Sequence, residues 1–159
     1  VIFFDRTPSP LFETAVSYAA SLIQAITKSG ARVGFVSVGE QSQVFPMQLD
    51  EQHRRNLFYH LAKVDCDSKT SFATVLEENR LNTEVKQSTS IVVTSNLTLD
   101  LTRKLELLSG QQRMFILYLV KEKNENLSKE ESVLVERLAQ RQIQLHIVKD
   151  QNYKEVSSP

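Results

Sequence analysis

The sequence predicts a doubly wound α/β domain, in which helices cover both faces of a mostly parallel sheet. Five short, continuously apolar segments have the character of buried strands, and four of them are separated from their predecessor by helical periodicity. Strands and helices that alternate in this way are typical of parallel sheets. With 159 residues, of which 41% are apolar, the chain is also long enough to bury a core of its own.

The predicted strands follow from these apolar runs and from one segment with a different pattern. The buried strands span Val1 to Asp5, Arg32 to Val38, Ser90 to Thr94, Met114 to Val120 and Gln142 to Val148. The segment Gln43 to Leu49 alternates weakly and contains Pro46, which a central strand would not tolerate. We therefore expect an antiparallel edge strand there, returning through a hairpin at Gly39 to Ser42.

Helices are predicted where apolar residues recur every three or four positions. They span Leu11 to Ser29, Glu51 to Ala62, Ser71 to Asn82, Leu99 to Leu108 and a last segment that begins at Ser128. Capping signals mark their ends: Gly30 follows the first helix, Thr98 precedes the fourth, and Ser128 with Glu131 forms a capping box. Because no repeat or linker divides the chain, we expect residues 1–159 to form one domain, cut from a longer protein.

Charge and composition exclude several classes of partner. The chain has 19 basic and 19 acidic side chains, so it offers no basic excess for nucleic acid or an anionic membrane. No apolar run reaches the ~20 residues that span a bilayer. The single cysteine, Cys66, forms no internal disulfide. We expect a cytoplasmic domain, whose longer parent protein could still carry a membrane anchor.

Polar residues follow the first strand, where a ligand site is expected. In open α/β sheets ligands bind beyond the carboxyl ends of the strands. There Asp5, Thr7 and Ser9 alternate along an extended turn, and Thr70 lies in the loop before the third predicted helix. Carboxylate and hydroxyl oxygens are donors that Mg²⁺ accepts, so these four residues predict a metal site. Ordinary turn chemistry remains an alternative, with Ser9 capping the first helix and Pro10 at its first position.

Two stretches resemble von Willebrand factor A-like domains: Val1 to Ser9, and the helix and strand between Phe12 and Gly39. Within that superfamily the chain is most similar to the bacterial YeaD-like family (domain of unknown function 58), and the order of elements extends the resemblance over nearly the whole chain. The resemblance implies a metal-ion-dependent adhesion site. It would consist of the four residues named above, with Thr7 in place of the first Ser of the motif.

The sequence departs from this motif at one position. Where the superfamily has an Asp after the fourth strand, this chain has Ser95 or Asn96. Loss of a formal charge lowers the expected affinity for Mg²⁺, although Asp65 or Asp67 could compensate. The resemblance thus implies a degenerate metal site with weak Mg²⁺ binding at best, in a non-enzymatic protein-interaction module. Because its relatives commonly occur beside MoxR-type AAA+ ATPases, it also implies such an ATPase as partner.

An enzyme is the alternative hypothesis, because a strand that ends in Asp5-Arg6-Thr7 also resembles haloacid-dehalogenase-like phosphatases. Asp5 would be the nucleophile, Thr94 or Ser95 would bind phosphoryl oxygens, and Lys104 would offset charge. Against it, Thr7 replaces the general acid of that motif, and the later acidic pair that holds Mg²⁺ is missing.

The remaining chemistry-bearing residues form no recognisable motif. His53 and His60 lie on one helix face but too far apart to share a metal, so we expect surface or half-buried positions for them. The glycines form no phosphate-binding loop.

Overall fold

A computed structural model gives the fold and describes residues 1–69, 72–76, 87–111 and 113–149. Its sheet has six strands in the order β3-β2-β1-β4-β5-β6. The strands are β1 (Ile2–Asp5), β2 (Val33–Val38), β3 (Gln43–Gln48), β4 (Ser90–Thr94), β5 (Phe115–Lys121) and β6 (Gln144–Lys149). All neighbouring strands pair in parallel except β2 and β3, which are antiparallel. The predicted fold class and the edge strand with Pro46 are therefore confirmed.

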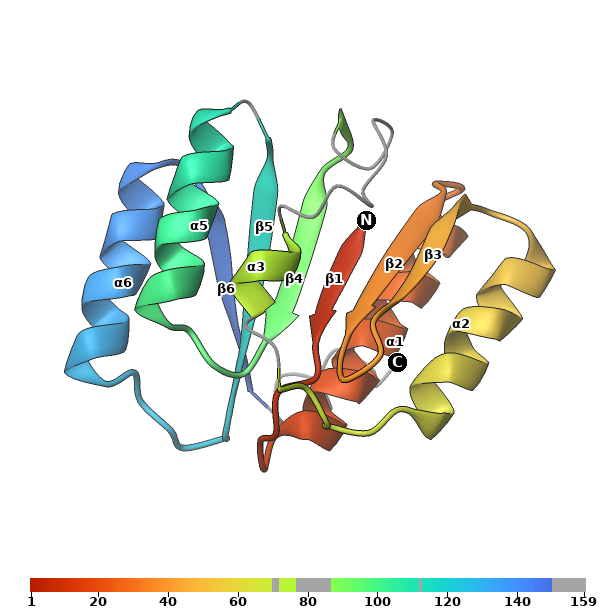
Figure 1. Ribbon diagram of the computed structural model, residues 1–159, viewed down its shortest axis with the longest axis horizontal. Coiled ribbons are helices and arrows are strands. Elements are labelled where there is room, and N and C mark those ends of the chain that lie inside the picture. Colours follow the sequence, from red (N-terminus) through yellow and green to blue (C-terminus); the bar gives the residue numbers. More distant parts are fainter. Residues whose placement is uncertain (70–71, 77–86, 112, 150–159) are drawn as a thin grey trace.

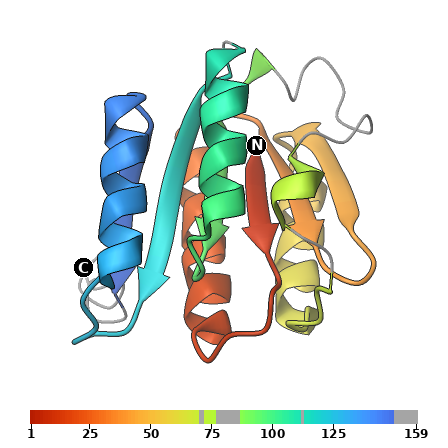
Figure 2. The same cartoon turned by 60° about the vertical axis from the view of Figure 1, so that its left-hand side comes forward.

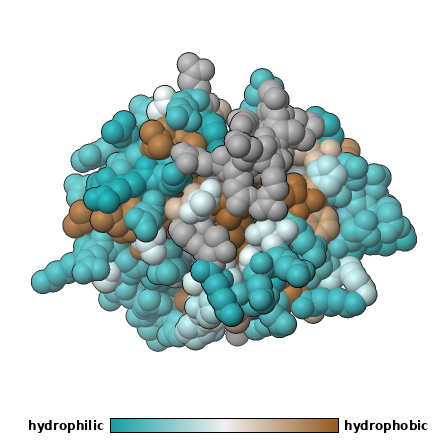
Figure 3. Space-filling model, in the orientation of Figure 1, coloured by the Kyte–Doolittle hydropathy of each residue, from teal (hydrophilic) through white to brown (hydrophobic). Residues whose placement is uncertain are grey.

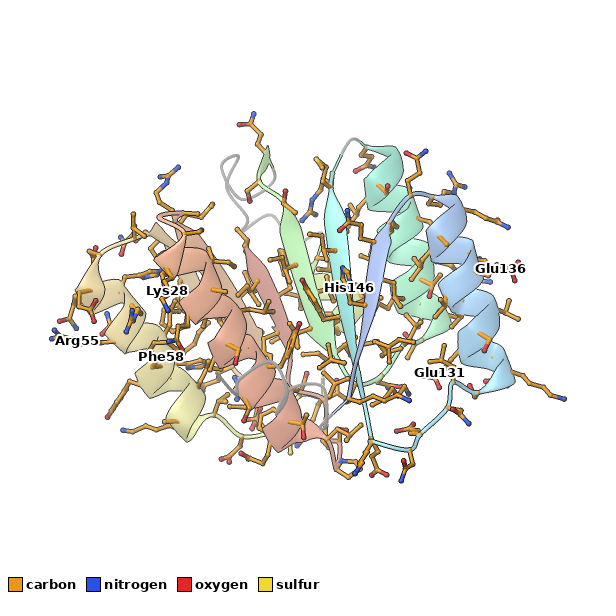
Figure 4. The ribbon with its side chains drawn as sticks, turned by 180° about the vertical axis from the view of Figure 1, so that it is seen from behind. Lys28, Arg55, Phe58, Glu131, Glu136 and His146 are labelled. Carbon is orange, nitrogen blue, oxygen red and sulfur yellow. The ribbon has the colours of Figure 1, made fainter. Side chains whose placement is uncertain are left out.

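Helices form a layer on each face of this sheet (Figures 1 and 4). On one face lie α1 (Phe12–Lys28) and α2 (Glu51–Lys63), and on the other lie α3 (Phe72–Val75), α5 (Leu99–Gly110) and α6 (Lys129–Gln140). The turned view in Figure 2 shows α5 and α6 side by side in front of the sheet. The third predicted helix, Ser71 to Asn82, coincides with α3 where it is described, and its other residues lie outside the described ranges.

Two hydrophobic cores result, one beneath each helical layer. Consecutive residues of β1 alternate between them: Phe3 packs with α3, α5 and α6, whereas Phe4 packs with α1 and α2. Both phenylalanines have no exposed surface. Burial on both faces explains why the central strands are continuously apolar in sequence.

The helix ends confirm most of the capping signals. Gly30 has φ 84°, a left-handed conformation that glycine adopts without strain. The Thr98 side chain accepts a hydrogen bond from a backbone N–H of α5, and Ser128 and Glu131 form the complete capping box of α6. The first helix differs from the expectation, because it begins at Phe12 and has no side-chain cap.

One histidine also lies deeper than expected. His53 is only 4% exposed, because its Nε2 forms a 2.7 Å hydrogen bond with the backbone oxygen of Val33 in β2. His60, on the same face of α2, is half-buried as expected. Both rings therefore serve to pack α2 against the sheet.

The face shown in Figure 3 is hydrophilic over most of its described surface. Among the described residues, no helix combines the length and the apolar character needed to cross a membrane.

Candidate functional site

The strand order reverses between β1 and β4, which is where an open α/β sheet binds its ligands. From β1 the chain proceeds to one side through β2 and β3, and from β4 it proceeds to the other through β5 and β6. Asp5 ends β1 and Thr94 ends β4. Their carboxyl ends lie together at the lower edge of the sheet in Figure 1.

The Asp5 carboxylate is held at this junction by three hydrogen bonds. Its Oδ1 accepts the backbone N–H of Thr7 at 2.9 Å and the Thr7 hydroxyl at 2.5 Å. Its Oδ2 accepts the hydroxyl of Thr94 at 2.7 Å. Since Asp5 is only 8% exposed, these bonds replace most of the water that a carboxylate would otherwise bind. The carboxylate is consequently fixed in one orientation.

A hollow of about 270 Å³ lies over Asp5 and is lined mainly by polar side chains. Besides Asp5 and Thr7, its polar residues are Ser68, Lys69, Asn96, Thr98 and Asp100. Sequence reasoning missed Asp100, which lies in the first turn of α5. The available signal was the Thr98 cap, because a helix that begins there directs its first turn toward the carboxyl edge of β4. We call this cavity the Asp5 hollow.

The structure brings together only part of the predicted metal site. Thr7 contacts Asp5 directly, whereas the hydroxyl of Ser9 accepts the backbone N–H of Leu11 at 3.1 Å and does not line the Asp5 hollow. This contact is local turn chemistry, but Ser9 does not cap the first helix as the alternative supposed, because the N-cap residue of α1 is Leu11 and Pro10 lies before the helix. Thr70 lies outside the described residues.

The donors at the Asp5 hollow suit a weakly held, largely hydrated divalent cation. A carboxylate has about four lone-pair positions, of which the three hydrogen bonds to Asp5 leave one available. Thr7 donates its proton to Asp5 and keeps its own lone pairs. Asp5, Thr7 and Asp100 would hold such a cation, and the Lys69 ammonium in the same lining opposes it. Within the described ranges, no three His, Cys, Asp or Glu side chains cluster as metal ligands.

Asp65 and Asp67 do not compensate for the missing carboxylate, contrary to the possibility raised from the sequence. Both line a separate and larger hollow of about 680 Å³, between the β2–β3 hairpin and α2. Asp67 is also engaged there, because its Oδ1 accepts a 2.7 Å hydrogen bond from Arg6 Nη2. We call this cavity the Arg6 hollow.

His60 contributes a neutral imidazole to the Arg6 hollow. Its Nε2 lies 2.7 Å from the hydroxyl of Ser37, and its ring packs against Phe45 with the ring centres 5.1 Å apart. Burial lowers the pKa of His60 below its usual 6.5, and the nearby Arg6 guanidinium lowers it further. The ring therefore adds no positive charge to the hollow at neutral pH.

The geometry expected for a phosphatase is incomplete. The Thr94 hydroxyl contacts Asp5 and the backbone of Asn96, so it is already engaged. Lys104 lines a different hollow along α5, which Asp5 does not line. A nucleophilic Asp5 would thus lack the charge-offsetting Lys104 assigned to it from the sequence.

Comparison with known proteins identifies the family. Residues 2–155 match the profile of the family described as "Protein of unknown function DUF58". The chain belongs to this family. A DUF58-type relative, "Uncharacterized protein YeaD" of Bacillus subtilis (strain 168), is 34% identical over 148 residues. That match covers 93% of this chain and 36% of the relative, so the chain spans about a third of that protein's length.

Solved structures share the fold of this DUF58 chain. The crystal structure of the conserved hypothetical protein BatB from Bacteroides thetaiotaomicron aligns with a TM-score of 0.64 and 13% identity, covering 98% of this chain and 93% of BatB. An aerotolerance-related membrane protein from Bacteroides fragilis aligns with a TM-score of 0.62 and 11% identity, covering 98% of this chain and 94% of the other. The SpRpn10 VWA domain aligns with a TM-score of 0.62 and 10% identity, covering 99% of this chain and 93% of the other. The DUF58 chain thus has the von Willebrand factor A-like fold that its sequence predicts.

Proposed function

We propose that this domain is a non-enzymatic protein-interaction module that docks a partner at the carboxyl edge of its sheet. The observation that carries the proposal is the fixed Asp5 carboxylate beneath an open, polar hollow at the β1–β4 junction. A rigid polar site of this kind presents its groups to a ligand without first having to order them. The loops after β1 and β4 and the segment 64–71 would form the docking edge.

The chemistry of docking is a weakly held Mg²⁺ ion that the partner helps to coordinate. Asp5, Thr7 and Thr70 are the proposed ligands from this chain, and we add Asp100 because it lines the Asp5 hollow. Ser9, the fourth ligand expected from the sequence, is left out because its hydroxyl accepts the backbone N–H of Leu11 and does not line that hollow. An acidic side chain of the partner would supply the carboxylate missing at Ser95 or Asn96. Without metal, the hydroxyls of the same edge would bind the partner by hydrogen bonds.

Calorimetry tests the metal site. Mg²⁺ and Mn²⁺ are titrated to millimolar concentrations into the unaltered domain and into Asp5→Ala. We expect weak binding that is lost in Asp5→Ala and weakened in Asp100→Asn, with Asp65→Asn as the matched control because Asp65 lines the Arg6 hollow instead. No binding to the unaltered domain would refute the metal site and leave metal-free docking. Covalent trapping of a phosphoryl analogue on Asp5 would instead support the phosphatase.

The partner that we propose is a MoxR-type AAA+ ATPase. We also propose that residues 1–159 act as one domain within a longer, membrane-anchored parent protein. The support for an anchor is that a structural neighbour is described as a membrane protein. Binding of the purified ATPase, measured with and without Mg²⁺, tests this pairing. Binding that is unchanged by Asp5→Ala would place the contact elsewhere on the domain.

A further inference from the structure

The side chain of Arg6 lies on the opposite side of its segment from the side chains of Asp5 and Thr7. Asp5 and Thr7 line the Asp5 hollow, whereas Arg6 lines the Arg6 hollow and not the other. Such alternation is the rule in an extended segment. Arg6 is also only 7% exposed, and a charged group so deeply buried needs partners that offset its lost hydration.

The guanidinium finds these partners in two loops that are distant in sequence. Its Nε donates to the backbone oxygen of Asp65 at 2.9 Å, and its Nη2 donates to the Asp67 carboxylate at 2.7 Å. Its Nη1 lies 3.4 Å from the backbone oxygen of Gln41. The backbone oxygen of Arg6 in turn accepts the N–H of Ser68 at 3.1 Å. Arg6 therefore holds the segment that follows α2 through hydrogen bonds at Asp65, Asp67 and Ser68.

The loop after β2 leaves room for the same guanidinium and shares its carboxylate partner. The Asp67 oxygen that accepts from Arg6 also accepts the backbone N–H of Glu40 at 3.3 Å. A side chain at Gly39 would overlap the Arg6 guanidinium, because a Cβ placed there would approach it far more closely than real contacts allow. Gly39 is thus required for the position of Arg6 and not for a turn, since its φ lies outside the left-handed region.

We propose that Arg6 is a positioning residue of the docking edge. It fixes the segment 64–69 so that Ser68 and Lys69 form one wall of the Asp5 hollow, although Arg6 itself does not line that hollow. The inference rests on the proposed function for its biological meaning. A lysine could not replace Arg6, because a single ammonium lacks the planar fork that reaches two carbonyl oxygens and a carboxylate together.

Hydrogen–deuterium exchange measures this role without knowledge of the partner. In Arg6→Gln and Arg6→Lys, the amide of Ser68 should exchange about tenfold faster or more, because loss of a charge-assisted anchor favours local opening of the segment. Amides in the middle of α1 should keep their rates. Arg137→Gln is the matched control, since it removes an arginine that pairs with Glu106 on the other helical layer. Asp67→Asn removes the charged acceptor and should reproduce the effect with Arg6 intact.

The outcomes separate this inference from the proposed function. The positioning role would be overturned if exchange at Ser68 were unchanged in Arg6→Gln, Arg6→Lys and Asp67→Asn. It would also be overturned if exchange became faster to the same extent at Ser68 and in α1. A Mg²⁺ titration of the same variants adds the functional readout: with Asp5 intact, we expect affinity to fall several-fold in Arg6→Gln and not in Arg137→Gln. Should the unaltered domain bind no Mg²⁺, the metal site fails, while the exchange measurement still decides the role of Arg6.

Discussion

Two of the three hydrogen bonds to the Asp5 carboxylate come from Thr7, two residues away, and the third comes from Thr94 in β4. The bonds from Thr7 form within a single turn, and the bond from Thr94 exists only when β4 lies beside β1. Thr94 is completely buried, so its hydroxyl has no alternative partner in water. Loss of the Thr94 hydroxyl should therefore lower the stability of the fold and also change the orientation of Asp5.

Thr94→Val tests this bond, because valine has nearly the same shape and no hydroxyl. We expect the free energy of unfolding to fall by about 1–3 kcal/mol, since a buried carboxylate loses a donor and the backbone N–H of Asn96 loses its acceptor. Thr102→Val is the matched control: Thr102 is equally buried, but its hydroxyl donates to the neutral backbone oxygen of Thr98, so a loss of about 0.5–1.5 kcal/mol is expected. Urea denaturation measures both losses. Equal losses would argue against a charge-assisted bond at Asp5.

His60 gives the fold a dependence on mildly acidic pH. Its pKa is lowered in the folded state, first by burial and then by Arg6, so protonation favours the unfolded chain. The stabilisation is fully present above the unfolded pKa of about 6.5 and is lost as the pH falls toward the lower folded pKa. Between pH 7.5 and 5.5, His60→Gln should lose less stability than the unaltered domain. Urea denaturation at the two pH values measures both losses, and an equal loss in the two proteins would contradict the role of His60. Figure 4 shows another histidine, His146, on β6 at an exposed position away from this site.

At the scale of elements, α6 is joined to the end of β5 by charge. Lys121, the last residue of β5, lies 2.5 Å from Glu131 and 3.4 Å from Glu125, with its side chain only 7% exposed. Glu131 is also the acidic member of the capping box. The Glu131 carboxylate therefore both completes the N-terminal cap of α6 and pairs with the buried Lys121.

Glu131 should make this attachment sensitive to acid. Burial raises its pKa, but hydrogen bonds from Lys121 and Ser128 together outweigh that effect and leave the pKa below its usual 4.5. The resulting stability is present above about pH 4.5 and is lost as the pH falls through the lower folded value. Glu131→Gln should cost about 1–3 kcal/mol at pH 7 and less at pH 3. Thermal unfolding at both pH values measures this, and Glu130→Gln, at an exposed position, should cost little at pH 7.

At the scale of the whole molecule, the sequence predicted the fold well and the site only in part. The strands, the caps at Gly30, Thr98 and Ser128, and the edge position of Pro46 depend on neighbours within a few residues, so local patterns were sufficient there. The site depends on contacts between distant residues. Thr7 was predicted beside Asp5 because it lies only two positions along the chain, whereas Arg6 and the Asp67 that it pairs with are 61 positions apart. No local pattern indicates which hollow such a side chain lines.

That distance explains why the sequence did not indicate that Asp65 and Asp67 line the Arg6 hollow, and why Asp100 was missed. The loop after α2 contributes residues to both hollows, and Arg6, whose side chain lies opposite those of Asp5 and Thr7, hydrogen-bonds the part that lines the Arg6 hollow. The von Willebrand factor A-like resemblance directed attention to Asp5 and Thr7, which line one hollow. It did not supply the electrostatic partners of residues outside the motif.

The bond between Asp5 and Thr94 joins residues 89 positions apart, at the seam where the two halves of the sheet meet. During synthesis on a ribosome, β1, β2, β3 and α2 emerge well before β4 does. Until β4 has emerged and inserted beside β1, Asp5 lacks its third donor and the hollow above it lacks Asn96, Thr98 and Asp100. The proposed docking edge is therefore complete only after β4 has been made, and a nascent chain that still lacks β4 would lack one wall of the Asp5 hollow.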